Sequence, residues 1–143
     1  MPERSWTRAS KGFIALSGLL VIAGCAALAP FNQYSFDETA RLRKEAHHLL
    51  GKAREPYSSH AREADSVLAG VGRAYRDASI RTRNQESMRR WETLLDTNKA
   101  SLAGTVMRWR REGTLSAGVI AAARKDIAAD FQAISSLEGD KGR

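Results

Sequence analysis

Apolar residues between positions 57 and 78 recur at spacings typical of one face of a helix. The stripe alternates steps of four and three residues without interruption and consists of Tyr57, Ala61, Ala64, Leu68, Val71, Tyr75 and Ala78. A heptad stripe of this length needs a second helix to cover it. We therefore expect it to pack against other helices of the chain, with a homo-oligomer formed through residues 57–78 as the alternative.

Four further stretches show helical periodicity and capping signals. We expect helices at about 35–53, 85–95, 99–112 and 116–139, with the helix that carries the heptad stripe starting near Pro56. The expected caps are a Ser35–Glu38 capping box, the turn Asp96–Asn98 before the fourth helix, Gly113 after it, and Ser116. No stretch shows the alternation of a strand, so the expected fold is all-α, a small bundle of about four to five helices.

A different signal precedes these helices. The apolar run 13–25 follows three basic residues and ends in the only cysteine of the chain, which is typical of an export signal. Its last four residues, Ile22-Ala23-Gly24-Cys25, resemble the lipobox of bacterial lipoproteins. The resemblance implies cleavage before Cys25 and acylation of that residue with membrane-anchoring chains. The expected organisation is a signal peptide at 1–24, a lipidated terminus and tether at 25–34, and a helical domain at 35–143.

The same run allows an alternative. The 18 residues 12–29 carry no charge, which is just long enough for an uncleaved transmembrane anchor. That alternative is weakened by Ser17, Gly18 and Gly24, which lower the hydrophobicity of the segment. In the lipoprotein family as sorted in enterobacteria, Ala26 after the cysteine implies the outer membrane, with the domain facing the periplasm.

Basic residues are concentrated in the middle of the chain. The formal net charge is +7, and ten basic residues face four acidic ones between Arg73 and Arg111. Within this segment, arginines flank two tryptophans, Trp91 and Trp109. The candidate anion-binding or partner-binding residues are Arg89, Arg90, Arg108, Arg110 and Arg111. Such a cluster can bind phosphates while the rings stack on a ligand, but both tryptophans also fall on apolar stripes, which favours a place in the core.

Signals for catalysis or metal binding are weak. The Glu45–His48 spacing has no second copy, so we expect no metal site, and Cys25 is committed to the anchor. We find no nucleophile motif and no phosphate-binding loop, and therefore expect neither an enzyme nor a cofactor.

Two functions remain as expectations. The first is a non-enzymatic interaction or scaffolding module, held at the envelope by lipid on Cys25 and binding an envelope protein. The second is a binder of an anionic lipid, lipopolysaccharide or cell-wall polymer through the arginines. Nucleic acid is an unlikely partner for an exported chain.

Overall fold

The computed structural model describes residues 29–143, so the signal peptide, the lipobox and Cys25 lie outside the described residues. The described part is all-α, as expected. Its five helices are α1 (Gln33–Gly51), α2 (Tyr57–Ser79), α3 (Gln85–Leu95), α4 (Leu102–Glu112) and α5 (Ala117–Asp140). None of these helices has an apolar stretch long enough to cross a bilayer.

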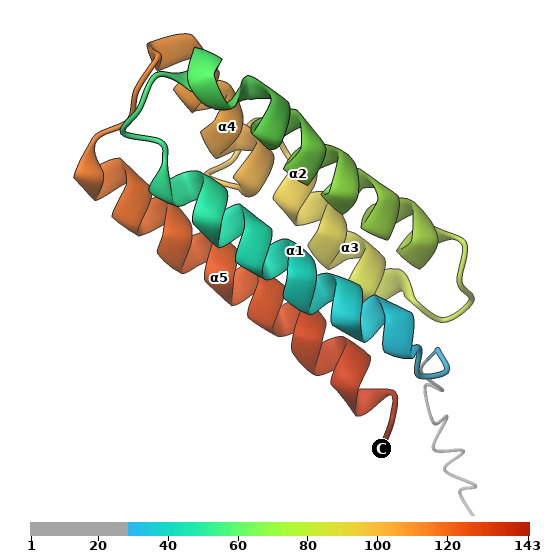
Figure 1. Ribbon diagram of the computed structural model, residues 1–143. Helices are drawn as coiled ribbons and strands as arrows, with labels where there is room; N and C mark the ends of the chain where they lie inside the picture. The colour runs from blue at the N-terminus through green and yellow to red at the C-terminus, as the bar shows by residue number, and fades with distance from the viewer. Residues whose placement is uncertain (1–28) are drawn as a thin grey trace, which may run out of the picture.

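The helices form a four-rod bundle in which α3 and α4 together make up the third rod (Figure 1). The Asn84 side chain donates to the Ala78 carbonyl, which places the start of α3 beside the end of α2. The Tyr57 N–H donates to the Gly113 carbonyl, which places the end of α4 beside the start of α2. The rods α1 and α5 pack against each other along their length and close the bundle.

Two helix starts differ from the sequence prediction. α1 begins at Gln33, within the stretch expected to be a tether, because the Asn32 side chain caps it by accepting from the Ser35 N–H at 2.9 Å. The predicted capping box is wrong, since Glu38 instead accepts from Arg41. α4 begins at Leu102 rather than Lys99, because the Ser101 hydroxyl accepts from Gly104 and supplies the cap. Both caps are Asn or Ser side chains at N-cap positions, as helix chemistry requires.

The later boundaries agree with the prediction. Ser116 caps α5 through the Val119 N–H, and Leu115 and Ile120 on either side of it are both buried. α4 ends at Gly113, whose φ of 81° belongs to the region that favours glycine.

The core is built from one face of every helix. Trp109 is fully buried, meets Tyr57 edge-on at 5.4 Å between ring centroids, and donates from its indole nitrogen to the Glu55 carbonyl. Trp91 is buried too and meets Phe131 edge-on at 5.9 Å. Other fully buried side chains are Leu42, Leu49, Leu94, Leu102, Val106 and Ile134.

The heptad stripe of α2 packs against other helices of the same chain. Its members Ala64, Val71 and Ala78 are buried, and its larger members pack half-buried against the core. Small residues on α2 let neighbouring helices approach closely, since a Cβ at Gly70 would come within 2.6 Å of Leu42. The stripe therefore covers α1, α3 and α4 within one copy of the chain.

Candidate functional site

The two tryptophans predicted to stand among the arginines are core residues. Trp91 is 3% exposed and Trp109 0% exposed, so neither ring can stack on a ligand. The apolar stripes of their helices had favoured this outcome. Only the arginines of the predicted cluster reach the surface.

Those arginines are divided between two helices and paired with acids. On α3, Arg90 lies 3.2 Å and Arg89 4.0 Å from carboxylate oxygens of Glu86. On α4, a carboxylate oxygen of Glu112 lies 2.8 Å from Arg108 and 3.7 Å from Arg111. Within residues 29–143, Arg110 is exposed and makes no ion pair.

The chain between these two groups keeps them apart. The second half of α3, the loop at 96–101 and the first half of α4 all separate Arg90 from Arg108. Arg89 borders one surface hollow, whereas Arg108 and Arg111 border another. The described structure thus does not bring the five arginines into a single patch.

The histidines do not gather into a metal site. His47 and His48 are exposed on α1, and His60 contacts Glu55 at 2.6 Å and Glu63 at 3.7 Å. No group of three or more His, Cys, Asp or Glu side chains in the described chain is arranged to hold a metal ion.

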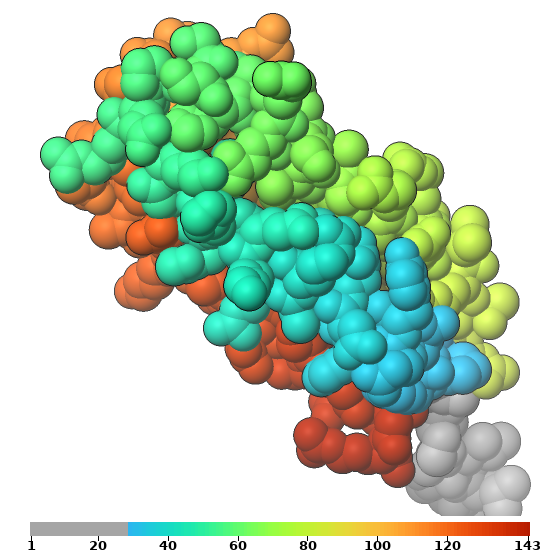
Figure 2. Space-filling model, in the orientation of Figure 1, coloured from blue at the N-terminus to red at the C-terminus, as the bar shows by residue number. Residues whose placement is uncertain are grey.

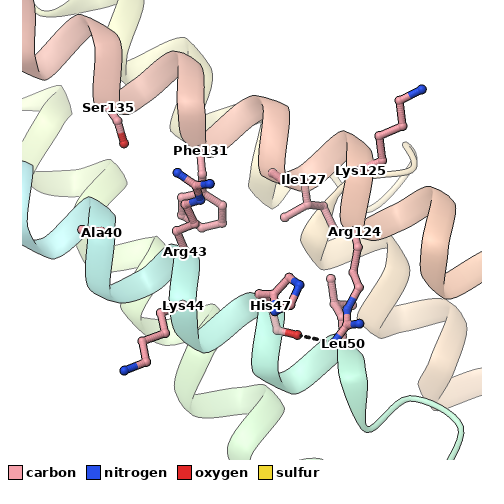
Figure 3. Close-up of a pocket in the computed structure, with 11 residues that line it drawn as sticks. Ala40, Arg43, Lys44, His47, Leu50, Arg124, Lys125, Ile127, Phe131 and Ser135 are labelled. Carbon is pink, nitrogen blue, oxygen red and sulfur yellow. Dashed lines mark hydrogen bonds between the residues drawn. The ribbon is translucent and has the colours of Figure 1, made fainter.

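A groove between α1 and α5 is the strongest candidate site. It has a volume of about 670 Å³, and Figure 3 shows side chains from both helices converging on it. The basic residues that line it are Arg43, Lys44, His47, Arg124 and Lys125, and the uncharged ones are Ala40, Leu50, Ile127, Ala128, Phe131 and Ser135. Not one of these lining residues is acidic. We call this feature the α1–α5 groove.

Its basic groups differ in how they are held. The Arg43 guanidinium donates to the Gln132 side chain at 3.1 Å, and Arg124 donates to the His47 carbonyl at 2.9 Å (Figure 3). In the described residues the Nε of Arg124 is buried and has no hydrogen-bond partner. Lys44 and Lys125 point outward from the two edges of the groove. The groove thus combines two hydrogen-bonded guanidinium groups, two outward-pointing ammonium groups and a histidine side chain.

The charge of the α1–α5 groove sets it apart from three other surface hollows of 510 to 670 Å³. Each of those has at least one acid among its basic residues: Glu45 and Glu63 in one, Glu92 and Asp96 in the second, and Asp126 in the third. An anion entering one of them would meet a fixed negative charge, whereas the α1–α5 groove presents none on its lining.

Sequence reasoning missed the α1–α5 groove because its basic residues lie outside the basic middle segment. The available signal was the spacing of Arg43, Lys44 and His47, which share one side of a helix, while the acid between them, Glu45, pairs with Arg41. Their partners Arg124 and Lys125 come 81 residues later, counted from Arg43 to Arg124. Only the pairing of α1 with α5 joins the two sets.

Comparison with known proteins adds no relative. No family model, curated protein or solved structure matches the chain.

Proposed function

We propose that the chain is an envelope lipoprotein in which lipid on Cys25 holds a non-enzymatic helical binding module at the membrane, facing the periplasm from the outer membrane. The lipobox-like Ile22–Cys25 and the basic residues before the apolar run support the anchor. Two or three acyl chains on one residue suffice for durable attachment, whereas one chain binds only marginally. Ala29, four residues after Cys25, is buried against the bundle and donates to the Arg83 carbonyl, so the module follows the anchor closely.

The α1–α5 groove is the observation that supports a binding role. It is large enough for a small ligand or for the side chains of a partner, since binding pockets typically measure about 300–1,000 Å³. Its mixture of an apolar floor and basic edges suits an amphipathic anionic partner. The first candidate is an acidic segment of an envelope protein.

A second candidate function is binding of an anionic envelope ligand such as a lipid or glycan phosphate. Sequence reasoning assigned it to the arginines of α3 and α4. Glu86 and Glu112 pair with all of those arginines except Arg110, whereas the guanidinium groups of Arg43 and Arg124 make no ion pair among residues 29–143. We therefore place this candidate function at the α1–α5 groove as well.

The anchor is tested by Cys25→Ala in the expressing cell. Loss of lipid labelling together with accumulation of unprocessed precursor supports the lipoprotein, since both steps need the thiol. Normal cleavage and release of the domain would show an ordinary signal peptidase site. Retention of the full-length chain by the wild type would show an uncleaved transmembrane anchor.

The groove is tested with matched pairs of neutralising variants. Arg43→Gln with Lys125→Gln removes two charges from the α1–α5 groove, and Arg89→Gln with Arg90→Gln removes two from α3. We expect the first pair to weaken binding of a phosphorylated core oligosaccharide, measured by calorimetry, far more than the second. Equal losses, or a larger loss with the α3 pair, would contradict the assignment.

Salt separates the two kinds of partner. The Debye length falls from about 30 Å at 0.01 M to about 3 Å at 1 M ionic strength, so binding through screened cations to a small anion should disappear over that range. Association with a protein that also buries apolar area should persist, and a pull-down from envelope extracts at both salt concentrations distinguishes them.

A further inference from the structure

Large apolar side chains are exposed mainly at one end of the bundle. In the described chain five such residues are exposed: Phe31 at 41%, Tyr34 at 64%, Phe36 at 37%, Ile80 at 82% and Met107 at 42%. The first four belong to the start of the described chain and to the loop after α2, and we call them the tether-end surface. An isoleucine at 82% exposure is costly in water, because its apolar area remains hydrated.

Several contacts bring these four residues to the same end. The Ala29 N–H donates to the Arg83 carbonyl at 3.2 Å, which joins the incoming chain to the loop that carries Ile80. The rings of Phe31 and Phe36 lie 6.3 Å apart between centroids. Tyr34 borders a small hollow together with Ala78, at the end of α2.

The last residues of the chain reach this end too. Phe36 is the nearest side chain to the position of a Cβ at Gly139, and Phe31 to that at Gly142. Figure 2 shows the first described residues in blue, the loop after α2 in yellow-green and the end of α5 in red gathered at one end of the molecule. Met107 is on α4. In the third rod, α3 is the half that starts at this end of the bundle, and α4 is the half farther from it (Figure 1).

The length of chain between the anchor and this end limits their separation. Cys25 precedes Ala29 by four residues, and even a fully extended chain covers at most about 3.6 Å per residue, or about 14 Å. If Cys25 is lipidated as proposed above, Ala29, which is bonded to the loop that carries Ile80, lies within that distance of the acylated residue. Met107 is outside this range when the bundle stands on its end.

We propose that the tether-end surface rests in the headgroup region of the membrane that holds the lipid on Cys25, so that the bundle stands upright on the membrane. Aromatic residues favour this region because it accepts both a ring and a hydroxyl, as Tyr34 offers. Arg76 and Arg83 flank Ile80 and can reach lipid phosphates while Ile80 enters the apolar boundary. The α1–α5 groove then runs up the side of the standing bundle and stays open to the periplasm.

This inference depends on the lipid anchor, and labelled variants that carry one cysteine in addition to Cys25 test both separately. Ile80→Cys and Met107→Cys are made in the full chain, purified as the lipoprotein, reconstituted into vesicles and labelled with an environment-sensitive dye. Both positions are exposed, so neither substitution removes core packing. We expect the label at position 80 to be quenched several-fold more by spin-labelled lipids than the label at position 107, and the order to reverse with aqueous iodide.

The outcomes separate the two proposals. Equal iodide access at both positions, with no quenching by lipid, overturns the upright orientation while the anchor stands. Shielding of position 80 from iodide without lipid quenching shows a protein or second copy on the surface and overturns it as well. If Cys25 is not acylated, the protein takes up two labels instead of one, even where an uncleaved transmembrane segment lets it float with the vesicles, and this result overturns both proposals.

Discussion

The ammonium group of Lys141 is buried at the tether end and held by three side-chain acceptors. Its Nζ lies 2.6 Å from a Glu138 carboxylate oxygen and 3.0 Å from the Ser87 hydroxyl, and it also donates to Asn84. The side chains of Lys141 and Glu138 are each only 2% exposed. This one residue therefore ties the end of α5 to the start of α3.

Lys141→Met should destabilise the protein strongly. Removing one member of a buried ion pair typically costs about 3–5 kcal/mol, and here it would leave Glu138 with only Arg81, whose guanidinium nitrogen lies 3.7 Å away and makes no hydrogen bond to it. Adding Glu138→Gln removes that charge and should recover part of the loss, since no poorly compensated carboxylate then remains in the buried site. Urea unfolding of the single and double variants measures both steps. A double variant as unstable as Lys141→Met would show that the ammonium, and not the stranded carboxylate, carries the effect.

Glu63 should make a small contribution to stability that depends on pH. Lys52 donates to both of its carboxylate oxygens, at 2.8 and 3.1 Å, and thereby lowers the pKa of Glu63 below its ordinary value. A lowered carboxyl pKa stabilises the folded state above the unfolded pKa, and this stabilisation is lost as the pH falls through the folded pKa. Both side chains are about one-third exposed, so the contribution should stay below about 1 kcal/mol.

The check for Glu63 is a pair of unfolding curves. Glu63→Gln should be less stable than wild type at pH 7 and equal to it below the folded pKa of Glu63, where wild-type Glu63 is protonated. Asp37→Asn, on an exposed carboxylate with no ion pair in the described residues, serves as the control. A deficit of Glu63→Gln that persists unchanged in acid would mean that it comes from packing.

At the scale of helices, α4 depends on a close approach of the loop before it. A Cβ added at Gly104 would lie 1.9 Å from the Lys99 carbonyl oxygen, whereas nothing lies within 4 Å of a Cβ at Gly118 in the first turn of α5. Gly104→Ala should therefore displace the loop and cost about 1–3 kcal/mol, as overpacking does. Gly118→Ala should gain up to about 1 kcal/mol by restricting the unfolded chain. Thermal unfolding compares them, and a neutral Gly104→Ala would refute the clash.

Patterns of neighbouring residues in the sequence predicted that the helices exist more accurately than they predicted the residues at which the helices begin. Alternating apolar steps and the caps Gly113 and Ser116 are read directly from neighbouring residues, so those features were predicted correctly. Near α1, however, Asn32 and Ser35 are both good caps, and near α4 both Asn98 and Ser101 are. The choice depends on tertiary contacts: Ala29 is buried against the loop after α2, and the Ser101 hydroxyl also donates to the Asp96 carbonyl.

The candidate site was less predictable because it depends on which helices are neighbours. The site was predicted at residues such as Arg90 and Arg108 because arginines are frequent in that part of the chain. The frequency of arginines does not show that an acid one helical turn away pairs with each of these two residues. The α1–α5 groove takes its basic residues from two helices far apart in the sequence, and Arg43 and Arg124 meet only in the folded bundle. Burial of Trp91 and Trp109 was foreseeable from periodicity, since both lie on apolar stripes.

At the scale of the whole molecule, the α1–α5 groove joins the first rod to the last. Its two sides are brought together only in the folded bundle, so an anion bound between them should bind the native state and not the unfolded chain. Binding of this kind stabilises the native state by about 2.7 kcal/mol when the free ligand is at 100 times its dissociation constant. A ligand of the groove should therefore raise the melting temperature, and the rise should continue with the logarithm of the free ligand concentration even after the groove is saturated.

This linkage gives a direct screen for the ligand. We expect phosphorylated envelope glycans or short-chain anionic lipids to raise the melting temperature of the purified protein in detergent at low salt, and to lose the effect at 1 M salt. Arg43→Gln with Lys125→Gln should abolish the shift, while Arg89→Gln with Arg90→Gln should keep it, although both pairs lower the net charge equally. A shift that disappears equally in both variants would mean that anions respond to the overall charge of the bundle and that the groove has no special role. A shift kept by both variants would place the ligand elsewhere on the bundle.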